Sequence, residues 1–131
     1  MSTVITKPKI QIEKKLLAEL KTLVKEERQV LIHCLFDAMN SDDCLIRIWP
    51  TTFLYATGSA HRSELVYADN ITMFPTWTLV PGASVYSFSL LFTGLPSDCS
   101  VFDFVEEIPE NGGFKVNGIK RNNSDVYFIK V

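Results

Sequence analysis

The sequence predicts an all-β fold, an antiparallel sandwich of seven to eight short strands. Apolar runs rich in β-branched and aromatic residues recur from residue 29 to the end of the chain, and Gly, Pro, Asn and Asp separate them. The clearest run is residues 84–92, where every second residue from Tyr86 to Phe92 is aromatic or leucine and predicts an inward-facing side. Helices do not alternate with these strands, so a parallel sheet is not expected.

The N-terminal part of the chain has a different composition. Residues 1–9 contain a proline and predict a flexible lead-in, whereas residues 10–131 predict a single β-sandwich domain. Within that domain, residues 10–27 fit two structures. Leucines and a valine recur at helical spacing between Leu16 and Val24, yet alternate residues of the same stretch also suit a strand. A short helix and an edge strand are therefore both open.

Two apolar runs follow and predict a β-hairpin. Residues 29–36 form a nearly continuous apolar run, as expected of a strand that is buried on both faces. Turn-forming residues separate this run from residues 44–49, which resume the strand pattern. Pairing the two runs about Met39 sets Cys34 opposite Cys44. A disulfide framework is not expected, because the chain has three cysteines and none has C-x-x-C spacing.

The middle of the chain contains a second predicted hairpin, at residues 51–71, and an aromatic loop. Residues 70–82 bring two prolines, a phenylalanine and a tryptophan close together. Because proline cannot donate to a sheet ladder, this stretch predicts an edge or a crossover. We expect Trp77 to plug the open end of the sandwich; the alternative is a partly exposed ring that stacks on a ligand or partner. Further strands are expected at residues 84–92, 101–107, 114–119 and 126–131.

Several short motifs follow from residue 90 onward, in LLFTGLPSDCSVFDFVEEIPENGGFKVNGIKRNNSDVYFIKV: residues 92–96, Phe102, Asp103, Glu106, Gly113, Phe114, Gly118, Ile119 and residues 125–127. Together with the earlier tracts IRIWPTTFLY and PTW, they resemble a loosely defined group of uncharacterised bacterial β-sandwich domains of immunoglobulin-like type. The resemblance spans residues 29–131. It implies an immunoglobulin-like antiparallel sandwich, with an edge strand at residues 17–27, and it implies no activity, cofactor or catalytic residue.

Composition and charge argue against several classes of function. The net charge is −2 and basic residues do not cluster, so nucleic-acid binding is not expected. No window is apolar enough to span a membrane and no secretory signal is visible, so we expect a soluble, cytoplasmic protein. The two histidines, His33 and His61, lack metal-site spacing, and no nucleophile motif is present. We therefore expect no metal, no cofactor and no enzymatic activity.

The function that these observations favour is a non-catalytic binding or scaffold module that acts through a sheet edge or loop ends. The candidate binding residues are Trp49, Phe74 and Trp77, three large rings next to or near prolines. We expect the partner to be another protein or a second copy of the chain, and the sequence specifies no small-molecule ligand. The alternative is a homo-oligomeric structural protein that uses residues 10–27 as its interface.

Overall fold

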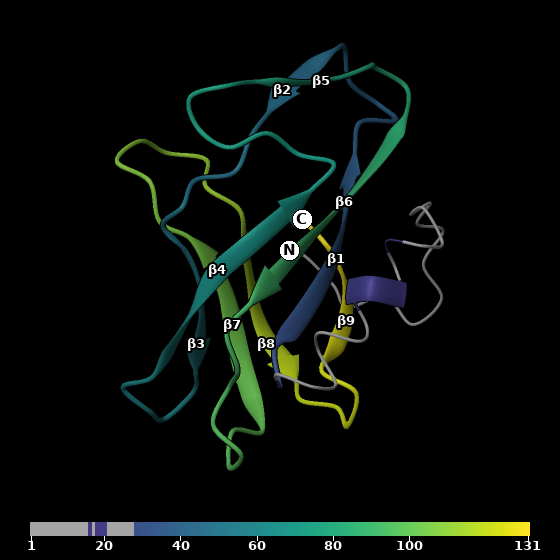
Figure 1. Ribbon diagram of the computed structural model, residues 1–131. Helices are drawn as coiled ribbons and strands as arrows, with labels where there is room; N and C mark the ends of the chain where they lie inside the picture. The colour runs from purple at the N-terminus through teal and green to yellow at the C-terminus, as the bar shows by residue number, and fades with distance from the viewer. Residues whose placement is uncertain (1–15, 17, 21–27) are drawn as a thin grey trace.

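The computed structural model describes residue 16, residues 18–20 and residues 28–131 (Figure 1). In this part of the chain the protein is all-β, as the sequence predicts, apart from the helical residues that precede the first strand. The described strands are β1 (Val30–Asp37), β2 (Cys44–Ile46), β3 (Thr52–Ala56), β4 (Arg62–Asp69), β5 (Thr78–Val80), β6 (Val85–Phe92), β7 (Val101–Glu106), β8 (Lys115–Lys120) and β9 (Val126–Lys130).

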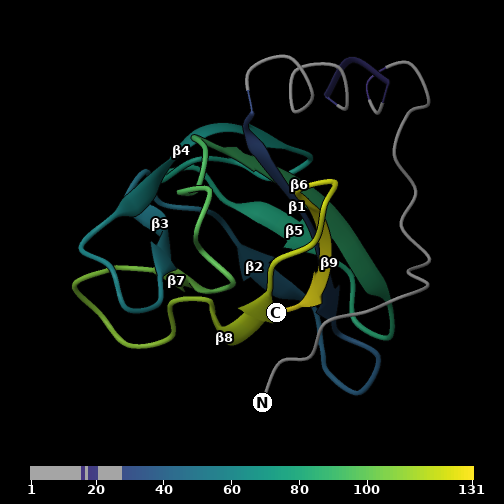
Figure 2. The ribbon, with the colours of Figure 1, turned by 90° about the horizontal axis from the view of Figure 1, so that it is seen from below.

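Seven of these strands form one mixed sheet that nearly closes into a barrel. The strand order is β8-β7-β3-β4-β6-β1-β9, with β8 and β9 at the two ends. Figure 2, a view from below, shows the strands arranged in a ring. Neighbouring strands are antiparallel except β1 and β9, which run parallel. The remaining strands, β2 and β5, form a small antiparallel sheet across one end of the barrel (Figures 1 and 2).

This strand order corrects two details of the predicted sandwich. The described residues contain nine strands rather than seven to eight. The sheet is not wholly antiparallel either, because the last strand returns beside β1 in the same direction. An immunoglobulin-like sandwich is not confirmed, since a single sheet contains seven of the nine strands and continues around the ring.

The predicted hairpin about Met39 is wrong. β1 pairs with β6 and β9, whereas β2 pairs with β5. Cys34 therefore lies opposite Phe88, Cys44 lies opposite Val80, and all three cysteines of the chain are free. The physical reason is burial. A strand that is apolar on both faces is most stable with strands on both edges and cover on both faces, which a hairpin with the short β2 would not provide.

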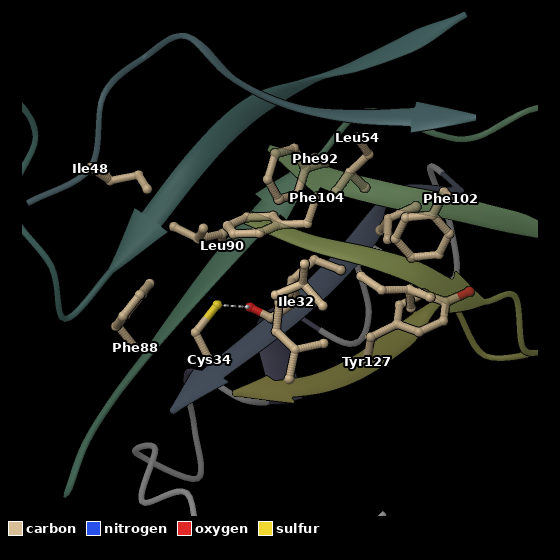
Figure 3. Close-up of a cluster of buried hydrophobic side chains, with 14 of the residues drawn as sticks. Ile32, Cys34, Ile48, Leu54, Phe88, Leu90, Phe92, Phe102, Phe104 and Tyr127 are labelled. Carbon is tan, nitrogen blue, oxygen red and sulfur yellow. Dashed lines mark hydrogen bonds between the residues drawn. The ribbon is translucent and has the colours of Figure 1, made fainter. Parts of the chain in front are cut away.

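Aromatic rings from β6 and β7 fill the interior of the barrel (Figure 3). Phe88 and Phe92 of β6 are 1% and 0% exposed, which confirms the inward face predicted for this strand. Phe92 meets Phe104 of β7 edge to face, with ring centroids 6.1 Å apart. Burying a phenylalanine side chain contributes about 1.5–3 kcal/mol to folding, so these rings account for a large share of the core's stability.

The outer face of β1 and β6 is covered as well. The described residues of the segment 10–27 are helical, and Leu20 packs there against Leu31 and Leu91. This contact explains why β1 is apolar on both faces, and it favours the helical interpretation of the segment over the edge strand. Among the described residues, no helix has the length and apolar character to cross a membrane. The predicted lead-in, residues 1–9, lies outside the described residues.

The ring is open between β8 and β9, where side chains join the two edges. Arg121 donates from Nε to Asp125 at 2.6 Å and from Nη1 to the carbonyl of Pro96 at 2.7 Å. The Tyr127 hydroxyl donates to Asp125 at 2.9 Å and accepts from the N–H of Asn122 at 3.0 Å. Burial raises the pKa of Tyr127, so this hydroxyl stays neutral and remains a donor. The turn between β8 and β9 is thereby tied to the rim of the barrel.

Candidate functional site

The structure brings together the three binding candidates that the sequence predicts, Trp49, Phe74 and Trp77. The rings of Trp49 and Phe74 stack with centroids 3.8 Å apart and an interplanar angle of 27°. Trp77 joins them through Arg47, whose guanidinium carbon lies 3.6 Å from the centre of the Trp77 ring and 4.6 Å from that of Phe74. We call these four residues the arginine–aromatic cluster.

Arg47 is a member of this cluster that sequence reasoning missed. Its Nη1 donates to the carbonyl of Pro75 at 3.0 Å, and its Nη2 lies 3.7 Å from the carboxylate of Glu110. The Arg47 side chain is only 13% exposed, so its charge lies against rings rather than in water. Its position in the sequence is a usable signal. Leu45, Arg47 and Trp49 are alternate residues, so in an extended segment they lie on one face, with Arg47 between two large apolar side chains.

Backbone hydrogen bonds hold the loop that carries Phe74 and Trp77. The N–H of Ile48 donates to the carbonyl of Thr72 at 2.9 Å, and the carbonyl of Ile48 accepts from the N–H of Phe74 at 2.8 Å. The N–H of Thr72 donates to the hydroxyl of Thr78 at 3.0 Å. These bonds hold the loop against Ile48, so both of its rings come to lie beside the segment that follows β2.

Trp77 does not plug the barrel, which corrects the prediction made for it. Trp77 is 49% exposed and Phe74 is 40% exposed. On β5 the inward-facing residue is Val80, which is fully buried. Because side chains alternate along a strand, Leu79 and Trp77 point outward. Leu79 lies directly opposite Leu45, and both are more than half exposed. The outer face of the β2–β5 sheet is thus an apolar surface in contact with water.

A pocket of about 370 Å³ adjoins the cluster. One of its lining residues, Glu106, is 7% exposed. One carboxylate oxygen of Glu106 accepts from the N–H of Trp49 at 2.9 Å, and the other accepts from the N–H of Phe114 at 3.0 Å. Burial raises the pKa of Glu106, while these two bonds and the charge of Arg47 oppose the rise. The lining consists of Phe36, Cys44, Leu45, Ile46, Arg47, Trp49, Trp77, Glu106, Ile108, Glu110, Asn111, Gly112 and Phe114.

The loop after β7 reaches this carboxylate because of a glycine. The backbone N–H of Glu106 donates to the carbonyl of Phe114 at 2.8 Å, which brings the far end of the loop back to β7. A Cβ at Gly113 would collide with the carbonyl oxygen of Glu106. Only glycine permits this close approach, and the approach sets the Phe114 ring and N–H against the pocket.

The histidines and the thiol of Cys34 lie in other environments. His33 Nδ1 on β1 is 2.8 Å from the Ser89 hydroxyl on β6, and His61 Nε2 is 3.1 Å from the carbonyl of Gly94. Burial raises the pKa of the Cys34 thiol, which keeps it protonated and unreactive. In the part of the chain that the structure describes, no three His, Cys, Asp or Glu side chains are grouped as metal ligands. The charged and aromatic groups that line the pocket are two carboxylates, one guanidinium and four aromatic side chains.

Glu106 is a second residue of the site that sequence reasoning did not select. Alternating residues of β7 point inward, so Phe102, Phe104 and Glu106 share the buried side. A carboxylate in such a series is a usable signal, because charged side chains are rarely buried without partners.

No protein-family model, curated protein or solved structure matches the chain.

Proposed function

We propose that the protein is a non-catalytic binding module whose ligand or partner occupies the arginine–aromatic cluster and the adjoining pocket. The observation that carries this proposal is the half-exposed state of Trp77 and Phe74, two large rings that stack against Arg47 and Trp49. Rings held in place before binding lose little conformational entropy when a ligand covers them. They also have apolar area left to bury, which is the usual source of binding free energy.

Loop ends support this proposal better than a sheet edge does. The edge strands of the large sheet are β8 and β9, and they end the two sides of the same nearly closed ring. The turn between them is tied down by the contacts of Arg121, Asp125 and Tyr127. A strand added at either edge would have to fit beside those contacts, whereas the cluster is open to water.

Three expectations from the sequence stay proposals beside this one. A relationship to immunoglobulin-like domains is supported by the succession of short strands around a core of inward-facing rings. A cytoplasmic location rests on the sequence. A homo-oligomer built on residues 10–27 is favoured by no described contact, since Leu20 packs on Leu31 and Leu91 of its own chain.

A fragment screen tests the binding-module proposal. A library of anionic, cationic and neutral fragments is screened by ligand-observed NMR against the wild-type protein, Trp77→Ala and Tyr67→Ala. Tyr67 is the matched control, because it is an aromatic residue of β4 with a similar exposure, 47%, outside the cluster. We expect fragments whose binding is lost in Trp77→Ala and retained in Tyr67→Ala. Fragments retained equally by both variants, or the absence of any binding fragment, would overturn the proposal.

A further inference from the structure

We propose that the pocket beside the arginine–aromatic cluster binds one organic cation, an ammonium or guanidinium group of its ligand. The inference rests on the proposed function, since it names the chemical class that the same site takes. The charged residues in the lining are the carboxylates of Glu106 and Glu110 and the guanidinium of Arg47, a formal charge of −1. One bound monocation would make the lining neutral.

The carboxylate of Glu106 has capacity for a further donor. An ionised carboxylate offers about four lone-pair positions, and the N–H groups of Trp49 and Phe114 take one on each oxygen. Both oxygens act as acceptors, which is the pattern of the ionised form. The residue is 7% exposed, so little water reaches the group. A cation in the pocket would supply the counter-charge that water supplies elsewhere.

Arg47 is already engaged in other contacts. Its guanidinium lies against the rings of Trp77 and Phe74, donates to the carbonyl of Pro75 and forms an ion pair with Glu110. Among the described residues, the ion-pair partner of Arg47 is therefore Glu110, the more exposed of the two carboxylates that line the pocket. The charge of Arg47 acts on Glu106, but in the described part of the chain its ion pair and its hydrogen bond are formed with Glu110 and Pro75, so a ligand's cation can still contact the buried carboxylate.

The pocket walls also suit a cation. Four aromatic side chains line the pocket: Phe36, Trp49, Trp77 and Phe114. The faces of such rings attract cations, and the attraction is stronger where water is excluded. Arg47 demonstrates this preference within the protein, with its guanidinium carbon 3.6 Å from the centre of the Trp77 ring.

Other ligand classes fit less well. An anion would face the carboxylates of Glu106 and Glu110, and the positive charge of Arg47 is already paired. A neutral ligand would cover Glu106 without compensating its charge. The volume of about 370 Å³ lies near the lower end of the range for ligand pockets, roughly 300–1,000 Å³. That size suits a single side chain or a small ammonium compound.

Tryptophan fluorescence provides the readout. The chain has two tryptophans, and both line the pocket. The full-length protein is titrated with tetramethylammonium chloride, Nα-acetyl-lysine methylamide and Nα-acetyl-arginine methylamide at a constant ionic strength set with sodium chloride. Neutral Nα-acetyl-citrulline methylamide is the matched control for the arginine compound. We expect saturable binding of cations, and binding of the arginine compound at least about tenfold tighter than that of citrulline, because charge-assisted hydrogen bonds are the stronger ones.

Two lysine variants test the role of charge without disturbing the core. Glu110→Lys changes the formal charge of the lining from −1 to +1 at a side chain that is 61% exposed, so the fold is retained. Glu64→Lys makes the same change at an exposed residue of β4 outside the pocket. We expect cation affinity to fall at least about tenfold in Glu110→Lys and to stay within about twofold in Glu64→Lys.

The pattern of affinities separates the sources of the cation. Tighter binding of tetramethylammonium supports a small quaternary ammonium ligand, whereas tighter binding of the lysine or arginine compound supports a basic side chain of a partner protein. Equal affinity for arginine and citrulline, no saturable response to any cation, or equal losses in the two lysine variants would overturn the inference. If neutral fragments still bind in a Trp77-dependent manner, the binding module stands and only its assignment to cations falls.

Discussion

In both the β6 strand and the small β2–β5 sheet, side chains point alternately to the two faces, but the large apolar side chains lie in opposite environments. On β6, Phe88 and Phe92 face the barrel interior and are at most 1% exposed. On the small sheet, Leu45 and Leu79 face each other across the two strands and are 56% and 58% exposed. Their neighbour Ile46, on the other face, is 6% exposed. Both regions therefore bury one face. On the other face, β6 buries Leu91 under Leu20 and exposes Val85 near its start, whereas the small sheet leaves both leucines in water.

The difference shows that a periodic pattern assigns residues to faces and leaves open what covers each face. The seven strands of the large sheet surround the buried side chains of Phe88 and Phe92. The small sheet lies across one end of that ring, so only its inner face has protein against it. An apolar face that a folded chain leaves in water is a common mark of a binding surface. The following changes test this contrast, in order of decreasing effect.

Phe92→Ala should have the largest effect on stability. The side chain is fully buried and packs edge to face on Phe104, so its removal leaves a cavity that costs about 3–5 kcal/mol. Urea denaturation followed by circular dichroism measures this loss. Val85→Ala is the control, because it lies on the same strand and is 52% exposed. A loss below about 1 kcal/mol in Phe92→Ala would contradict the enclosed core.

A neighbouring pair of residues on β2 tests the two faces of the small sheet. Ile46→Ala should destabilise the protein by about 2–4 kcal/mol, because its side chain is 6% exposed and packs against the barrel core. Leu45→Ala, one residue earlier, should change stability by no more than about 0.5 kcal/mol. The same denaturation experiment compares the two. Equal losses would mean that the outer face of the sheet is covered after all.

Glu106→Gln should cost about 1–3 kcal/mol. The N–H groups of Trp49 and Phe114 point at different carboxylate oxygens, and glutamine replaces one of these oxygens by an NH2 donor, so one part-buried N–H loses its acceptor. Denaturation at neutral pH measures the loss. A variant as stable as the wild type would show that these two hydrogen bonds do not stabilise the fold.

The same variant should also change how stability depends on pH. Because the pKa of Glu106 is raised in the folded protein, the folded state binds this proton more tightly than the unfolded state does. The contribution of Glu106 is therefore most favourable below the ordinary glutamate pKa of about 4.3 and is lost as the pH rises through the raised pKa. The stability curve of Glu106→Gln should be flatter in this window. Superimposable profiles would contradict the raised pKa.

Trp77→Ala should have only a small effect on stability. The ring is 49% exposed, and its main described contact is with the Arg47 guanidinium. Loss of a partly exposed cation–π contact costs about 0.5–1 kcal/mol. Urea denaturation measures this cost. A loss above about 2 kcal/mol would show that Trp77 acts as a plug.

Parts of the fold and of the site could be predicted because their signals are local. The alternation from Tyr86 to Phe92 identified an inward face. The prolines around Phe74 and Trp77 identified an edge or crossover segment, although the expected burial of Trp77 was wrong. The pairing about Met39 failed because the true partner of β1 is β6, which is far along the chain, and nothing near Met39 encodes that preference.

Arg47 and Glu106 were missed for a related reason. Arg47 looks solvent-exposed when it is considered alone, and Glu106 continues the inward series of Phe102 and Phe104 but has a charged side chain, which is typical of exposed residues. Arg47 loses its exposure only because the loop with Pro75 folds over the same strand, and Glu106 loses its exposure because Gly113 lets another loop approach. Both effects need segments that are distant in sequence.

The amino-acid sequence by itself determined the all-β class, the side to which each residue of β6 points, and the helical periodicity before the first strand. Tertiary structure alone decided which strands pair, that the large sheet nearly closes into a ring, and that the rings of the cluster remain in water beside a pocket. The physical reason is range: backbone preference and side-chain periodicity act over a few residues, whereas strand pairing and burial depend on contacts between segments far apart in the chain.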